Sequence, residues 1–117
     1  MTMLRKFCRS KIHNARITMK DLEYEGSITI DQEIMELAEI ANDEIVAVFN
    51  LNNGLRFETY VIPGNKGSGV IGLNGAAARL GEIGDRLIIL AFAYMDAKEI
   101  ENFTMRNIRL DENNHPT

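Results

Sequence analysis

The sequence is poor in the residues that form disulfides and metal sites, with one cysteine and two histidines. The lone thiol, Cys8, cannot form an internal disulfide, which excludes a disulfide-stapled secreted domain and favours a reducing compartment. So few cysteines and histidines cannot supply the four ligands typical of structural zinc, and we expect no metal. The longest apolar run, residues 87–93, is far shorter than the roughly 20 residues of a transmembrane helix. We therefore expect a cytoplasmic protein without a membrane partner.

The sequence has no long run of positive or of negative residues, and the net charge is only −4. The basic residues form neither a run nor a tail in the sequence, which argues against a nucleic-acid partner. The length of 117 residues, with 45% hydrophobic and 26% charged residues, predicts a single globular domain over residues 1–117. An acidic balance remains compatible with a local positive pocket that binds an anionic substrate.

Short β-rich segments separated by turn signals run through the chain. Predicted strands cover residues 10–19, 27–30, 44–50, 55–62, 70–75 and 84–95. The "NNG" at residues 52–54 predicts a hairpin turn, while Asp31 and Asp96 are the residue type that begins helices. The polar tail, residues 107–117, is expected to add at most one short strand and to fray. The pattern predicts a mainly β fold, a small closed barrel with short helices.

The dipeptide Gly26-Ser27 allows two interpretations. The ordinary one is a turn glycine followed by a surface serine. Alternatively, the Ser27 hydroxyl attacks the carbonyl of Gly26 and converts the amide into an ester, provided that the peptide is strained and the oxyanion is held. Glycine suits this chemistry because it permits unusual backbone angles and leaves the carbonyl open. The dipeptide alone does not decide between the two.

Two pairs of polar residues recur at strand spacing. Lys11 and His13 are two apart, so a strand places them on one face, as solvated side chains or as a positive wall for an anion. Arg56 and Tyr60 also share a face. They fit an ion-pairing surface with Glu58, or a carboxylate clamp beside a phenol that moves a proton.

The stretch "NGAAAR" at residues 74–79 is rich in small residues. Small residues let the backbone approach a ligand closely and leave N–H groups near a helical start, which suits an anion. Tight packing between elements is the alternative. A nucleotide-binding P-loop is excluded, since its lysine and glycine spacing are absent.

Four blocks together resemble the aspartate 1-decarboxylase family in order and spacing: "SKIH", "YEGSITID", "NNGLRFETY" and "NGAAAR". The resemblance runs from about Lys11 to Tyr94. It implies a pyruvoyl-dependent enzyme that converts L-aspartate into β-alanine and carbon dioxide, the β-alanine supply for pantothenate and coenzyme A. It also implies a double-psi β-barrel and a homotetramer whose active sites lie between subunits.

The resemblance further implies a proenzyme that cuts itself between Gly26 and Ser27. The products would be a β-chain, residues 1–26, and an α-chain, residues 27–117. Ser27 would become the pyruvoyl group, which forms a Schiff base with the substrate and requires no metal. Thr59 would assist processing and also lie in the substrate site. Tyr60 would be the proton donor.

Substrate binding is implied for a larger set of residues: Lys11, His13, Arg56, Thr59, Asn74, Gly75, Ala76 and Ala77. Lys11 and His13, in the block "SKIH", would act across the subunit interface. Two positions depart from the family pattern, since Asn14 stands where arginine is usual and Ile28 where some members have cysteine. A regular strand sends Thr59 and Tyr60 to opposite faces, so the strand must bend there or the site must lie at a subunit junction.

An alternative function is an uncleaved double-psi barrel that acts as a binding or assembly module. Between these two lies a decarboxylase that needs an accessory maturation factor as a partner. All three share the fold, and they differ in what happens at the bond between Gly26 and Ser27.

Overall fold

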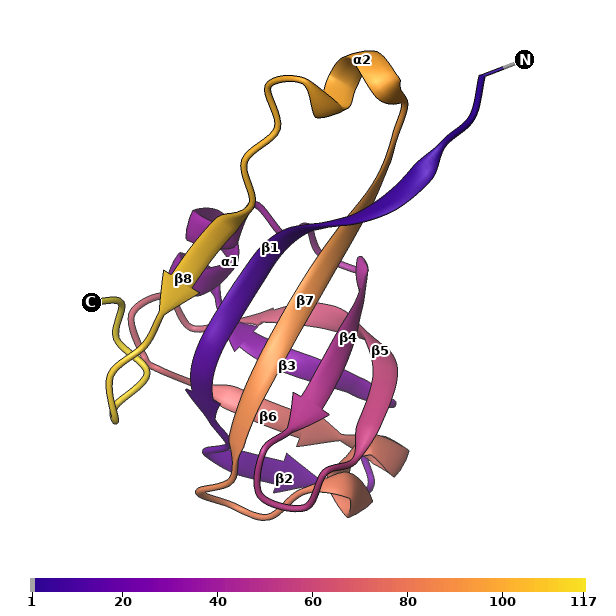
Figure 1. Cartoon of the computed structure of the whole chain (residues 1–117). Coiled ribbons are helices and arrows are strands. Elements are labelled where there is room, and N and C mark those ends of the chain that lie inside the picture. The colour runs from indigo at the N-terminus through magenta and orange to yellow at the C-terminus, as the bar shows by residue number, and fades with distance from the viewer. Residues whose placement is uncertain (1) are drawn as a thin grey trace.

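The computed structural model describes residues 2–117, which fold into strands wrapped around a common core, with short helices (Figure 1). The strands are β1 (Arg5–Arg16), β2 (Met19–Asp21), β3 (Ser27–Asp31), β4 (Ile45–Asn50), β5 (Arg56–Gly64), β6 (Ile71–Asn74), β7 (Arg86–Met95) and β8 (Arg106–Arg109). The helices are α1 (Gln32–Ala38), the 3-10 helix η1 (Gly75–Leu80) and α2 (Ala97–Ile100). No helix in residues 2–117 is long and apolar enough to cross a membrane.

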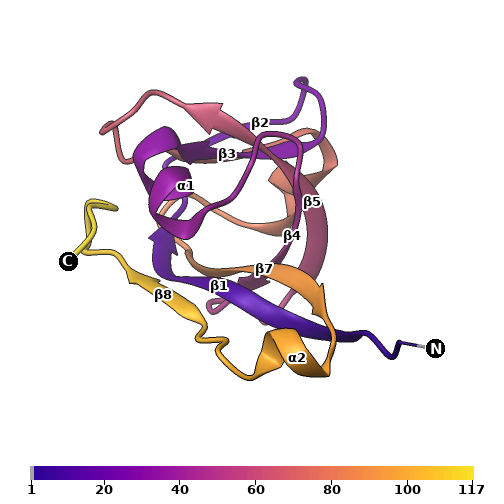
Figure 2. The same ribbon diagram turned by 90° about the horizontal axis from the view of Figure 1, so that it is seen from above.

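The strands form one continuous sheet in the order β2-β6-β3-β5-β4-β7-β1-β8. Seen from above, the sheet curls around a centre and α1 covers one side (Figure 2). The interior is aliphatic, with these fully buried side chains: Ile12, Ile28, Ile30, Ile34, Val46, Val48, Val61, Ile71, Leu73, Leu87 and Ile89. The predicted mainly β fold, small and barrel-like, is confirmed.

Strand β5 joins the two halves of the sheet by changing its partner along its length. Its first part pairs antiparallel with β4, from Arg56 opposite Phe49 to Tyr60 opposite Ile45. From Val61 onwards it pairs in parallel with β3 instead. The strand is correspondingly curved (Figure 1). The change of partner falls directly after Tyr60, so the regular ladder with β4 still includes both Thr59 and Tyr60.

Strand β1 pairs with β7 along most of its length, with an irregularity between Ile12 and Ala15. Asn14 lies in this irregularity with a φ of 65°. Asparagine tolerates this left-handed backbone better than most residues with a side chain. Its side-chain amide donates a hydrogen bond to the carbonyl of Leu110 at 3.0 Å, which ties the bulge to the end of β8.

The prediction that the C-terminal tail frays is wrong, because a buried asparagine ties the tail to the barrel. Asn114 is 0% exposed, and its Nδ2 donates hydrogen bonds of 2.8 Å to the carbonyls of Arg16 and Gly69. Its Oδ1 accepts a hydrogen bond from the backbone N–H of Arg16. Polar residues therefore hold this tail by buried hydrogen bonds, which composition alone does not reveal.

Asp31 begins α1 as predicted and also anchors a distant loop. The side chain is 1% exposed, and its Oδ1 accepts 2.8 Å hydrogen bonds from the N–H groups of Glu33 and Gly67. Its Oδ2 accepts a further 2.8 Å bond from the N–H of Gly69. One buried carboxylate thus joins the end of β3, the start of α1 and the loop before β6.

We expect Asp31→Ala to lower the free energy of unfolding by about 2–4 kcal/mol, because three backbone N–H groups lose a charged acceptor. Urea denaturation at fixed protein concentration measures the change. Asp96→Ala is the matched control, since Asp96 caps α2, a helix without buried residues. That control should lose only about 0.5–1 kcal/mol. Equal losses in the two variants would contradict the anchoring role of Asp31.

Candidate active site

Ser27 is not a surface serine, because it is the first residue of β3 and is 0% exposed. Its Oγ donates a hydrogen bond of 3.1 Å to the carbonyl of Glu25, two residues back along the chain. The hydroxyl is therefore folded back towards the peptide bond between Gly26 and Ser27. Gly26 itself is exposed, so the bond lies at the surface with the serine side chain beneath it.

Asn74 holds the hydroxyl from the neighbouring strand β6. Ser27 and Asn74 are directly paired across the antiparallel ladder. The side-chain amide of Asn74, 2% exposed, donates to Ser27 Oγ at 3.0 Å and to Thr29 Oγ1 at 2.9 Å. The two amide protons thus bind two hydroxyls on one face of β3. The sequence did not single out Thr29, although its spacing from Ser27 places both on the same face.

Gly75, which begins η1, packs directly against the backbone of Gly26. Gly75 has a φ of +62°, and a Cβ at this position would lie 2.6 Å from Gly26 Cα, 2.7 Å from Gly26 N and 2.9 Å from Tyr24 O. No side chain fits in that space. Of the two alanines that follow, Ala76 is exposed and Ala77 is buried. We call Ser27, Thr29, Asn74 and Gly75 the serine cluster.

Thr59 and Tyr60 lie on β5, the strand next to β3 in the sheet. Both are half-buried, and both line one open depression of ≈ 670 Å³, which no residue of the serine cluster lines. The ladder between β4 and β5 is regular through both residues. Ile28 pairs with Val61, so Ser27 and Tyr60 each lie one residue before the start of the same parallel ladder. Among the described residues, neither side chain is hydrogen-bonded to Ser27.

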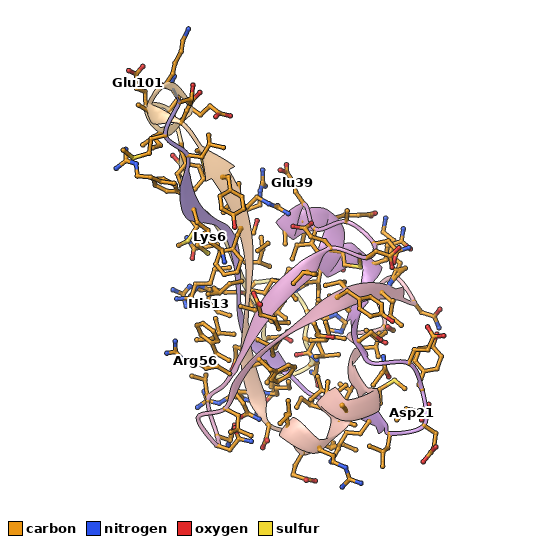
Figure 3. All side chains as sticks on the ribbon, turned by 90° about the vertical axis from the view of Figure 1, so that its right-hand side faces the viewer. Lys6, His13, Asp21, Glu39, Arg56 and Glu101 are labelled. Carbon is orange, nitrogen blue, oxygen red and sulfur yellow. The ribbon has the colours of Figure 1, made fainter. Side chains whose placement is uncertain are left out.

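Lys11, His13 and Arg56, which we call the cationic wall, are not brought to Ser27 within one chain. Lys11 and His13 lie on β1, and β5, β4 and β7 separate β1 from β3 in the sheet. Arg56 is four residues from Tyr60, roughly 13 Å at the ordinary rise of a strand. His13 and Arg56 are on one side of the barrel, whereas Asp21, the end of β2, is on the other (Figure 3).

Two side chains of the cationic wall, Arg56 and His13, each contact a residue on the adjacent strand. The Arg56 guanidinium lies 4.1 Å from the ring centre of Phe49, directly across the β4–β5 ladder, in a cation–π contact. In the described part of the chain Arg56 forms no ion pair with Glu58. His13 Nε2 lies 2.9 Å from Asn107 Oδ1 on β8. The sequence did not identify Phe49 or Asn107, although the hairpin register places Phe49.

The remaining reactive side chain, Cys8, has the character of a packed thiol. Partial burial raises the pKa of Cys8 above its usual value, and the thiol donates a hydrogen bond to the carbonyl of Ser10 at 3.3 Å. A raised pKa lowers the fraction of nucleophilic thiolate. Residues 2–117 contain no group of three or more His, Cys, Asp and Glu side chains that could hold a metal ion. The serine cluster is therefore the strongest candidate for chemistry.

Comparison with known proteins covers almost the whole chain. The chain is 53% identical over 114 residues to the aspartate 1-decarboxylase of Thermoanaerobacter pseudethanolicus, covering 97% of both chains. It is 54% identical over 114 residues to that of Kosmotoga olearia, again covering 97% of both. Identity to the Chlorobium phaeobacteroides enzyme is 57% over 108 residues, which are 92% of this chain and 82% of the relative. Residues 3–117 match the family model for aspartate decarboxylase, and the chain belongs to that family.

Proposed function

We propose that this chain is a proenzyme that cleaves itself between Gly26 and Ser27 and then decarboxylates L-aspartate to β-alanine and carbon dioxide. The observation that carries the proposal is the buried Ser27 hydroxyl, hydrogen-bonded to Glu25 O and to Asn74 Nδ2. This pair of contacts holds the hydroxyl beside the exposed Gly26. Membership of the aspartate decarboxylase family supports both the reaction and the substrate.

Cleavage follows from atoms that are already close together. Ser27 Oγ attacks the carbonyl carbon of Gly26, the C–N bond breaks, and the hydroxyl proton passes to the released amine, which leaves an ester. Loss of the Ser27 α-proton then expels the Gly26 carboxylate, and hydrolysis of the resulting dehydroalanine releases ammonia and leaves a pyruvoyl group at position 27. Asn74 orients the attacking oxygen, and we assign Thr59 the role of assisting this step from β5.

Ser27 and its surroundings fit a pyruvoyl group. Ser27 supplies its carbon atoms at the buried start of β3, and the exposed Gly26 leaves a cut end that is free to move away. When formed, the pyruvoyl group supplies an electron sink for the charge left on the substrate carbon as carbon dioxide departs. We assign Tyr60, on the strand next to that of Ser27, the return of a proton to that carbon. The backbone from Asn74 to Ala77 lines the substrate site.

The cationic wall completes the site from a neighbouring subunit in this proposal. Aspartate carries two carboxylates, yet the serine cluster contains no cation. Lys11, His13 and Arg56 have the required charge but lie on the other side of the same barrel. A symmetric homotetramer would bring the wall of one copy to the serine cluster of the next. The unpaired Cys8 supports a cytoplasmic location.

Mass spectrometry of the purified protein tests the proposed cleavage. We expect a fragment of residues 1–26 and a fragment of residues 27–117 that is lighter than simple hydrolysis would leave, by the mass of one ammonia. Cleavage only after addition of host lysate would identify an accessory maturation factor. Intact chain under all conditions, with no β-alanine formed from aspartate, would leave the uncleaved binding module as the function.

Gly75→Ala should slow cleavage by about 10²-fold, because the added methyl group displaces the Gly26 backbone from the serine hydroxyl. The fraction of intact chain against time, followed on denaturing gels, measures the rate. Gly67→Ala is the matched control, since Gly67 also has a positive φ, +82°, but an added Cβ meets nothing within 4 Å. This control should cleave at the wild-type rate. Equal rates for Gly75→Ala and the wild type would exclude the proposed packing requirement.

Mixed tetramers test the sharing of the site. Ser27→Ala lacks the nucleophile and Arg56→Ala lacks a wall cation, so each alone should lose at least about 10²-fold in activity. Random co-assembly after co-expression should restore about a quarter of the sites, those that combine an intact serine cluster with an intact wall. Arg56→Ala should still be cleaved, because Arg56 is remote from Ser27. No recovery of activity in folded mixed tetramers would show that the two halves do not belong to one site.

A further inference from the structure

A second positive feature lies next to the cationic wall and shares only His13 with the proposed substrate site. A cavity of ≈ 480 Å³ is lined by three arginines, Arg16, Arg86 and Arg109, together with His13 and Asn14. We call it the arginine pocket. The sheet register brings these residues together, because Arg16 pairs with Arg86 across β1 and β7, and His13 pairs with Arg109 across β1 and β8.

The three guanidinium groups of the pocket are not neutralised by the protein. The ion pairs in the described residues use other cations, namely Arg9, Lys20, Lys66 and Arg106. No aspartate or glutamate side chain lines the cavity. Thr117 also lines the cavity, but within residues 2–117 no ion pair joins it or any carboxylate to Arg16, Arg86 or Arg109. Their charge is therefore available to a ligand.

Arg16 provides a second observation at the pocket. Its Nε is buried and has no hydrogen-bond partner among the described residues. A buried donor left without an acceptor is unfavourable, and such groups are rare unless an ion or ligand satisfies them. The Arg16 backbone is fixed by Asn114 on both its N–H and its carbonyl, so the residue is held at the pocket.

The arginine pocket is continuous with the wall that we assign to substrate binding. His13 belongs to both. Leu51 and Ile88 line the arginine pocket and also a smaller cavity of ≈ 250 Å³ that includes Arg56 and Phe49. An anion in the arginine pocket would therefore lie beside the anion-binding side chains of the proposed site, on the same side of the barrel.

We propose that the arginine pocket binds a small dianionic oxyanion. Guanidinium forks match the paired oxygens of phosphate and of carboxylate, so inorganic phosphate, a phosphate ester and a dicarboxylate share the required chemistry. Three guanidinium groups carry more positive charge than a monoanion can balance. Two of them balance the charge of a dianion, and the third can still donate hydrogen bonds to it. Binding in this pocket needs neither cleavage nor turnover.

Calorimetry on the full-length Ser27→Ala variant tests the proposal without any contribution from catalysis. Inorganic phosphate and succinate are titrated separately at low ionic strength, with sodium chloride as the monovalent reference. We expect saturable binding of one ion per chain. Phosphate alone, or phosphate and succinate together, supports an oxyanion site open to phosphate esters, whereas succinate alone supports a dicarboxylate site. No saturable binding of either ion would overturn the proposal.

Arginine variants in the same background show which residues bind the ion. Arg86→Gln and Arg109→Gln should each weaken binding at least about 10-fold, since each removes a charge-assisted hydrogen bond. Both side chains are exposed, so the fold should persist, and thermal unfolding checks this. Arg106→Gln is the matched control on β8, because Arg106 pairs with Glu39 away from the pocket. Unchanged affinity in the Arg86 and Arg109 variants, or an equal loss in Arg106→Gln, would also overturn the proposal.

Discussion

The active-site half of the molecule depends on β3 being held at both of its ends. Ile28 and Ile30 face the core and are fully buried, so the residues between and around them must present their polar side chains on the opposite face. That face is also largely buried, and it is satisfied at one end by the Asn74 amide and at the other by the N–H groups that bind Asp31. Without a hydrogen-bond partner, burial of the Ser27 hydroxyl would lower the free energy of unfolding by about 1–3 kcal/mol.

Under the proposed function, the same arrangement separates processing and substrate binding into two halves. Cleavage needs a held hydroxyl and a close backbone, both of which one chain supplies through Ser27, Asn74 and Gly75. A cation beside Ser27 is not needed for that step. Substrate capture needs positive charge, and the chain keeps this charge on β1, which three strands separate from β3, and at the far end of β5. A protein built in this way can carry a complete self-cleavage apparatus before its substrate site is assembled.

Local signals made much of the fold predictable. The helix start at Asp31 and the hairpin at residues 52–54 follow from short-range chemistry, and most strands follow from composition. The sequence predicted one strand over residues 10–19, whereas β1 ends at Arg16 and β2 is a separate strand, Met19–Asp21, that pairs with β6. The tail was misjudged for a similar reason, since Asn114 gains its partners from β1 and a distant loop. For the site, spacing alone could have found Thr29, whereas the contact between Gly75 and Gly26 could not be read from the sequence.

Asn14 shows how a departure from a family pattern can have a backbone cause. Sequence comparison interprets it as a lost cation. In the structure, position 14 has a φ of 65° and its amide binds Leu110 O, two demands that asparagine meets with little strain. The neutral residue also lies among Arg16, Arg86 and Arg109 in one cavity. A fourth guanidinium there would add repulsion to three that form no ion pair within residues 2–117, which a neutral residue at position 14 avoids.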